Sequence, residues 1–162
     1  HIVSRRQRQM CIRDRGTLGV LICWDQWYPE AARIMALKGA EILIYPTAIG
    51  FDENDDAKER EIQVNSWKTI QKSHAIANGI PLICVNRCGS ELSENSMRKI
   101  KFWGNSFICG PQGDTIFQAG EEEGFSLANI SMSKSEIVRR NWPFLRDRRI
   151  DEYADLQKRF FD

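Results

Sequence analysis

The sequence predicts an α/β fold built on a mainly parallel sheet. Three short apolar runs, of the kind found in strands that are buried on both faces, lie at residues 18–22, 41–45 and 81–85. Two segments with helical spacing of their apolar residues separate these runs, at 29–37 and 60–78. Strand, helix and strand in succession normally give parallel strands joined by a right-handed crossover. The length of 162 residues is enough for one domain with its own core.

The first helix has start and stop signals. Pro29 stands where helices often begin, and Glu30 suits the positive end of the helix dipole. Apolar residues then recur at near-helical spacing until Gly39, which is expected to end the helix. The strand that follows is expected to close at Pro46.

A polar loop at residues 50–58 leads into the second helix, which is expected from about Arg60 to Asn78 with Gly79 as its stop. One face of this helix carries Ile62, Trp67, Ile70, His74 and Ala77. A histidine in such a position is more often packed and hydrogen-bonded than a catalytic base, so His74 is expected to belong to the core.

The remaining chain predicts more strands and a third helix. Residues 86–101 are polar and follow a strand, and loops of this kind often carry sites in open α/β sheets. The strands and the turn expected after this loop lie at 102–109, 111–114, 115–118 and 125–130. A helix capped by Ser133 is expected over 133–140. The aromatic tail at 141–162 is expected to pack on its own body or on a partner subunit.

Charge and composition exclude some classes of partner. Lys and Arg number 23 against 22 Asp and Glu, so the net charge of +1 favours neither nucleic acid nor an anionic membrane. No run approaches the ~18 apolar residues that a membrane-spanning helix needs. Five cysteines without dense spacing do not resemble a secreted disulfide framework, which favours a cytoplasmic protein. Cys84 and Cys88 lack a second ligand pair nearby, so no metal and no cofactor is expected.

The first fifteen residues differ from the rest of the chain. They begin with His1, are rich in arginine and contain no acidic residue before Asp14. They lack the apolar core of a secretory signal, and their composition changes abruptly at Gly16. We therefore expect 1–15 to be a non-native or disordered leader and 16–162 to hold the fold. A basic arm for RNA is the alternative interpretation.

Cys23 is the first candidate for chemistry. It directly follows a predicted buried strand and precedes a helix, which is where a nucleophile sits at the edge of a sheet. A thiolate there can attack a carbonyl carbon or a nitrile. A free cysteine can equally be a small buried apolar residue, and position alone leaves both readings open. Because histidine is scarce, a base for this thiol is expected to be a carboxylate.

Several longer runs resemble one family. They are G-V-L-I-C-W-D-Q-W-Y-P-E at 19–30, G-A-E-I-L-I-Y-P-T-A-I-G at 39–50, H-A-I-A-N-G-I-P at 74–81, V-N-R-C-G-S-E at 85–91, F-W-G-N-S-F-I at 102–108 and P-Q-G-D at 111–114. Together they resemble the nitrilase superfamily of carbon-nitrogen hydrolases, and most of all its N-carbamoylputrescine amidases. The resemblance covers the chain from Gly16 onward.

The resemblance implies a four-layer αββα sandwich and a Glu-Lys-Cys triad in which Cys23 is the nucleophile. The family's Glu and Lys precede its nucleophile, and residues 1–22 contain neither residue type. We therefore expect 16–162 to be the C-terminal portion of such a domain, with a fold incomplete at the N-terminal side. The implied substrate is a small carbamoyl amine, and the implied assembly is a homodimer or a higher homo-oligomer.

Residues around Cys23 are expected to bind the substrate. The backbone N–H of Trp24 is the candidate oxyanion donor, and Thr47 and Ala48 at a predicted strand end are candidate substrate contacts. Asp52 is the candidate partner for a substrate ammonium, because the family has an acid at a matching position. Its acidic neighbours leave a solvated loop acid as the alternative interpretation, and Glu91 is a second candidate for the ammonium partner.

Two other functions stay open at this point. The missing Glu and Lys are also what a non-catalytic nitrilase-like interaction domain would show. An amidase or nitrilase with a different substrate is the other alternative, because residues outside this chain also shape the family's pocket.

Overall fold

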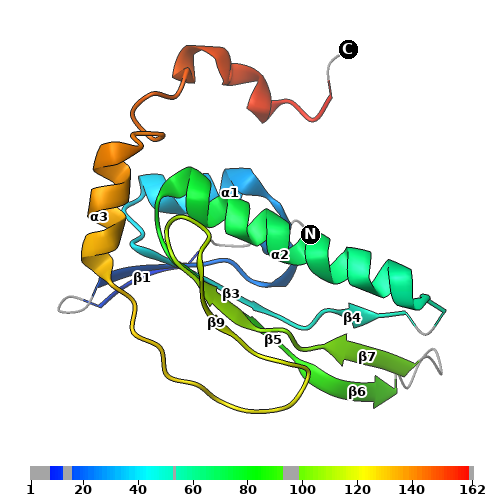
Figure 1. Cartoon of the computed structure of the whole chain (residues 1–162). Coiled ribbons are helices and arrows are strands. Elements are labelled where there is room, and N and C mark those ends of the chain that lie inside the picture. The colour runs from blue at the N-terminus through cyan, green and yellow to red at the C-terminus, as the bar shows by residue number, and fades with distance from the viewer. Residues whose placement is uncertain (1–7, 13–15, 53, 93–98, 161–162) are drawn as a thin grey trace.

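The fold is built on a six-stranded mixed sheet whose one face is covered by helices (Figure 1). This computed structural model describes residues 8–12, 16–52, 54–92 and 99–160. The strands, in their order across the sheet, are β1 (Arg8–Ile12), β2 (Gly16–Val20), β3 (Ile42–Thr47), β5 (Leu82–Asn86), β8 (Phe107–Cys109) and β9 (Thr115–Gln118). Strands β2, β3 and β5 are parallel, and the outer pairs are antiparallel. The predicted α/β fold with a parallel centre is confirmed.

The two predicted helices between the parallel strands are present. Helix α1 (Pro29–Leu37) begins at the predicted proline, and α2 (Ala57–Asn78) ends at Gly79, whose φ of 60° lies in the left-handed region that favours glycine. Helix α2 starts one turn earlier than predicted because the carboxylate of Asp56 accepts a 2.8 Å hydrogen bond from the Glu59 N–H.

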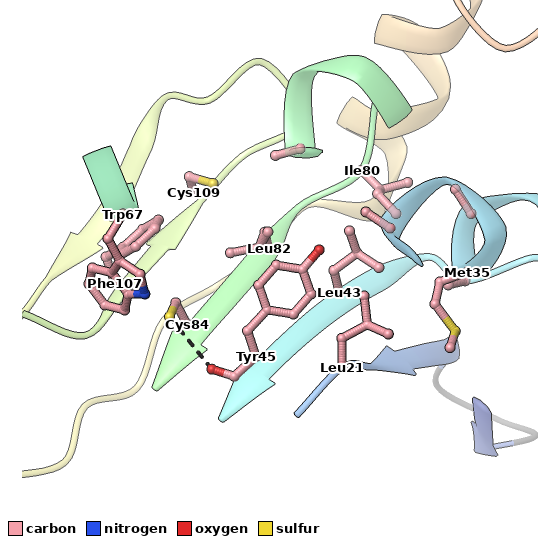
Figure 2. Close-up of a cluster of buried hydrophobic side chains, with 14 of the residues drawn as sticks. Leu21, Met35, Leu43, Tyr45, Trp67, Ile80, Leu82, Cys84, Phe107 and Cys109 are labelled. Atoms are coloured by element: carbon pink, nitrogen blue, oxygen red, sulfur yellow. Dashed lines mark hydrogen bonds between the residues drawn. The ribbon is translucent and has the colours of Figure 1, made fainter. Parts of the chain in front are cut away.

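The core lies between these helices and the sheet (Figure 2). Alternate residues of each central strand point toward the helices, so that Leu43 and Tyr45 of β3 and Leu82 of β5 are buried. The residues between them face the other side of the sheet, where Val85 is half exposed. The described residues therefore provide one helical layer and one sheet layer of an αββα sandwich.

The predicted loop over 86–101 is wrong. Strands β6 (Cys88–Leu92) and β7 (Lys99–Trp103) form a hairpin there, and with β4 (Gly50–Phe51) they make a second, three-stranded sheet. The hairpin is largely exposed, so its residues are polar and give no strand-like apolar pattern. A Cβ at Gly50 would overlap the Lys101 carbonyl group, so the pairing of β4 with β7 requires glycine.

Two more strand predictions are corrected. The single strand predicted over 102–109 is broken, because Gly104 and Asn105 both have positive φ angles, of 57° and 58°. The strand predicted over 125–130 is absent from the described chain, where Phe125 and Leu127 are 97% and 94% exposed and have no partner strand. Apolar residues without a neighbouring strand to pair with do not form a sheet.

Some strands and helices begin or end at other residues than predicted. Strand β2 ends at Val20 rather than at Ile22, and β3 runs through Pro46 to Thr47. Proline has no backbone N–H to donate to a neighbouring strand. It is tolerated at position 46 because the pairing of β3 with β2 ends at Ile44, so no hydrogen bond from residue 46 to β2 is needed. Helix α3 (Met132–Asn141) is preceded by Ser131 rather than by the predicted cap.

The C-terminal tail extends beyond the helices at the top of Figure 1. Its short 3-10 helices, η2 (Ile150–Glu152) and η3 (Ala154–Gln157), leave Ile150, Leu156 and Phe160 mostly exposed. This end of the tail therefore does not pack on its own body, and packing on a partner subunit stays a prediction. None of the described helices is long and apolar enough to cross a membrane.

The predicted leader is described only in part. The backbone of residues 8–12 forms β1, which pairs antiparallel with β2 so that Arg8 lies opposite Val20. Residues 1–7 and 13–15 lie outside the described residues. The prediction that 1–15 is a leader and 16–162 the fold stays a prediction.

Candidate active site

Cys23 lies where the chain turns from β2 into a 3-10 helix, η1 (Cys23–Trp27). Its φ angle of 54° is left-handed, which is unusual for a residue with a Cβ and costs about 1–2 kcal/mol. A sharp turn between a strand and a helix is the geometry that presents a nucleophile above the edge of a sheet. The thiol is exposed, so a substrate can reach it.

The turn at Cys23 is held from behind by Gln26, a residue that sequence reasoning missed. Gln26 is only 1% exposed. Its Oε1 accepts hydrogen bonds from Trp67 Nε1 at 2.8 Å and from Gln71 Nε2 at 3.2 Å, both on α2. Its Nε2 donates to Thr47 Oγ1 at 3.0 Å. The run C-W-D-Q-W gives no local signal that Gln26 is buried and Asp25 is not.

Thr47 and Ala48 lie at the carboxyl end of β3, and the bond from Gln26 ties this end to η1. The segment is fixed on its other side by Asn86, which is buried at the end of β5. The Asn86 side chain accepts from the Ile49 N–H at 2.9 Å and donates to the Ile49 carbonyl at 3.0 Å. The structure thus brings Cys23, Thr47 and Ala48 to the same edge of the sheet. This placement is expected for residues that follow neighbouring parallel strands.

Exposed aromatic side chains stand beside Cys23. Trp24, which is 57% exposed, donates from its Nε1 to the Tyr28 hydroxyl at 3.0 Å. The rings of Trp24 and Trp27 are 6.1 Å apart between centroids. This surface offers an apolar wall to a ligand that approaches the thiol.

These features match a known family. The family model for carbon-nitrogen hydrolases matches residues 6–140. The chain belongs to the carbon-nitrogen hydrolases. It is 45% identical to the N-carbamoylputrescine amidase of Solanum tuberosum and 37% identical to the citrullinase of Francisella tularensis, over 86% and 88% of this chain. A carbon-nitrogen hydrolase from Helicobacter pylori superposes with a TM-score of 0.88 at 57% identity, over 90% of this chain and 50% of that one. The chain spans about half the length of these relatives, covering 46% of the first and 49% of the second.

The two acids predicted to bind the substrate ammonium in this carbon-nitrogen hydrolase are Asp52 and Glu91. Neither takes part in the hydrogen bond that ties Thr47 to the Cys23 turn. Asp52 follows β4 and is exposed, and its Oδ1 accepts from the backbone N–H of Asn54 at 3.0 Å and from Asn54 Nδ2 at 2.8 Å. These bonds shape the turn that leads into α2. Glu91 lies on β6 in a half-exposed ion pair with Arg87.

The other described cysteines differ from Cys23 in their surroundings. Cys84 and Cys109 are buried, and burial raises the pKa of both thiols, that of Cys109 to about 12. Cys88 is half buried at the start of β6. Cys23 is the exposed thiol of this set, which favours it as the reactive one. Within the described part of the chain, no three His, Cys, Asp or Glu side chains lie close enough to hold a metal ion.

A cavity of about 700 Å³ lies away from this site. It is bounded by β5, β8 and the segment at 119–126, and neither Cys23 nor Thr47 lines it. The cavity and the Cys23 turn are therefore separate features of the described chain.

His74 is a packed core residue, as predicted. It is buried on α2, and its Nδ1 lies 3.1 Å from the hydroxyl of Tyr45. Burial lowers its pKa to about 4, against a weaker opposing effect of the Glu30 charge. A neutral, buried imidazole of this kind serves the core and not the thiol.

The low pKa of His74 predicts a loss of stability in mild acid. The unfolded chain takes up a proton near pH 6.5 while the folded chain resists it, so the stabilising effect is complete above pH 6.5 and is lost as the pH falls toward 4. We expect the free energy of unfolding to fall by about 2–3 kcal/mol more in the wild type than in His74→Gln over this window. Urea unfolding at several pH values measures the difference, and parallel pH curves for the two proteins would contradict it.

Proposed function

We propose that the natural protein carrying this chain is a cysteine-dependent amidohydrolase that removes the carbamoyl group from N-carbamoylputrescine. One observation carries the proposal: an exposed thiol with a left-handed backbone stands at the end of β2, tied through Gln26 to Thr47. The similarity to N-carbamoylputrescine amidases supports the substrate. The similarity to a citrullinase makes citrulline, another carbamoyl amine, the second candidate.

The proposed reaction has two steps at the sulfur of Cys23. The thiolate attacks the carbamoyl carbon, the carbonyl oxygen becomes an oxyanion next to the backbone N–H of Trp24, and the carbon–nitrogen bond breaks to release ammonia. Water then attacks the thiocarbamoyl enzyme, and the C–S bond breaks to return the thiol. The released carbamate splits into putrescine and carbon dioxide. The net reaction consumes one water for each substrate.

The resemblance implies that a Glu moves the protons and that a Lys helps to hold the oxyanion. In the family these two residues precede the nucleophile, and residues 1–22 of this chain contain neither residue type. The activity is therefore proposed for the natural protein in which these residues occur. No cofactor takes part in this scheme.

Ammonia release tests the proposal. We expect the natural protein to release ammonia and putrescine from N-carbamoylputrescine with a higher kcat/KM than it shows for citrulline, which differs by an α-carboxylate. A preference for citrulline would move the assignment to the second candidate. No ammonia from either compound, in folded protein, would favour the non-catalytic interaction domain.

The same assay tests Asp52 as the partner of the substrate ammonium. Asp52→Asn keeps the turn acceptor for Asn54 but removes the charge. We expect KM for N-carbamoylputrescine to rise by about fivefold with little change in kcat, since an exposed charge pair contributes about 1 kcal/mol. Glu53 carries the same charge next to it, so Glu53→Gln is the matched control. An unchanged KM in Asp52→Asn would remove Asp52 from this role.

We also propose a cytoplasmic homo-oligomer. The free thiols of Cys23, Cys84, Cys88 and Cys109 support a reducing compartment. The exposed apolar residues of the tail support contact with a second subunit, because exposed apolar patches on a protein surface often mark contacts with another protein.

A further inference from the structure

We propose that Gln26 is a positioning residue that fixes Cys23 relative to Thr47 and Ala48. The inference rests on the proposed function, because it assigns a role around the same nucleophile. Gln26 belongs to the same five-residue 3-10 helix as Cys23, so a shift of its backbone moves the thiol. Its side chain reaches inward to α2 and to the end of β3, and not toward the substrate side.

The pattern of bonds identifies this role. A buried side chain that only filled space would be apolar, since an apolar residue needs no partners. Gln26 instead uses both ends of its amide: Oε1 accepts from Trp67 and Gln71, and Nε2 donates to Thr47. Rotating or withdrawing this amide would leave Trp67 Nε1 buried without an acceptor. The amide therefore has one well-defined position, and so has the turn that carries it.

The strain at Cys23 explains why such a fixed point is useful. A left-handed residue that is not glycine tends to relax toward a right-handed conformation, and this relaxation would swing the thiol away from its present direction. The Gln26 bonds oppose it from the next turn of η1. Because Gln26 also donates a hydrogen bond to Thr47, it would keep the distance between Cys23 and the end of β3 constant. A reactive geometry is sensitive to such spacing, and a displacement of about 1 Å can cost about 100-fold in rate.

The test is Gln26→Met in the natural protein, because methionine has a similar length and volume but makes none of the three bonds. We expect kcat for N-carbamoylputrescine to fall by about 100-fold while KM changes less than about twofold. The rate at which iodoacetamide alkylates Cys23, followed by mass spectrometry of the Cys23 peptide, measures the reactivity of the thiol without turnover. We expect this rate to change in Gln26→Met as well. Tyr45→Phe is the matched control, because it removes a buried hydrogen bond to His74 elsewhere in the same core. We expect it to lower stability and to leave kcat and Cys23 alkylation unchanged.

A milder variant covers the case in which Gln26→Met does not fold. Trp67→Phe keeps an aromatic ring against Trp103 and Phe107, makes that ring smaller and removes the N–H that donates to Gln26. We expect a smaller fall in kcat at nearly constant KM. In a double-mutant cycle, Thr47→Val combined with Gln26→Met is expected to lose less activity than the sum of the single variants, because both remove the same bond.

The outcomes separate this inference from the proposed function. If the wild type turns over substrate, Cys23→Ala does not, and Gln26→Met keeps the wild-type kcat when folded, the positioning role is wrong and the proposed function stands. If Gln26→Met or Trp67→Phe changes KM and not kcat, the positioning role is likewise wrong. If Cys23→Ala keeps full turnover, the proposed function fails first.

Discussion

Replacing Cys23 with alanine is expected to lower kcat by at least about 10⁴-fold, because removing a covalent nucleophile leaves only binding and oxyanion stabilisation to act. The same change is expected to cost almost no stability, since the thiol is exposed and fills no core space. Ammonia release from N-carbamoylputrescine measures the first effect, and urea unfolding measures the second. Cys88→Ala is the matched control, because that thiol is half buried on β6 and is expected to leave kcat unchanged.

The left-handed backbone at Cys23 adds a second, independent measurement. Cys23→Gly and Cys23→Ala both lack the thiol, but alanine keeps the Cβ that clashes at a φ of 54°. We expect the glycine variant to be more stable than the alanine variant by about 1 kcal/mol. Normally glycine lowers stability relative to alanine, because it gives the unfolded chain more freedom. An alanine variant that is the more stable of the two would show that the turn is not strained.

The central part of the fold could be predicted from the sequence because its signals are local. Apolar runs, a proline at the start of α1 and a glycine at the end of α2 predicted the order strand, helix, strand, helix, strand. The hairpin of β6 and β7 could not be predicted in this way. Its residues pair with each other and with β4, but apart from Phe102 and Trp103 they bury little surface, so β6 and K-I-K at 99–101 look like a loop when the partner strand is unknown.

The candidate site shows the same division. Cys23 and Thr47 became candidates because both follow predicted strands, a position that neighbouring residues define, and because the quoted runs resemble the nitrilase superfamily. Gln26 and Asn86 were not, because nothing local distinguishes a buried amide from an exposed one. Their roles depend on partners far away in the sequence, such as Trp67 for Gln26 and Gly104 for Asn86. Side chains whose surroundings depend on distant partners are thus harder to predict than side chains whose place in the chain singles them out.

Replacing Trp67 with alanine is expected to give the largest loss of stability among single changes on α2. Trp67 is 0% exposed, and its ring centroid lies 5.8 Å from that of Trp103 and 5.7 Å from that of Phe107. Truncating a buried aromatic residue typically costs about 3–5 kcal/mol, from lost burial and from the cavity that remains. In this chain the change also removes the indole N–H that Gln26 accepts, so the support of the Cys23 turn weakens with the core.

Urea unfolding with a matched control on the same helix tests this expectation. Ile62 also lies on α2 but is 49% exposed, so Ile62→Ala is expected to cost less than about 1 kcal/mol. Trp67→Phe should fall between the two variants, because it keeps most of the ring packing and loses one hydrogen bond. A Trp67→Ala protein as stable as Ile62→Ala would mean that α2 does not pack on the sheet through this ring. Gln26 would then be held on α2 mainly by the 3.2 Å bond from Gln71, and the ring of Trp67 would not be what fixes the nucleophile turn to the helix.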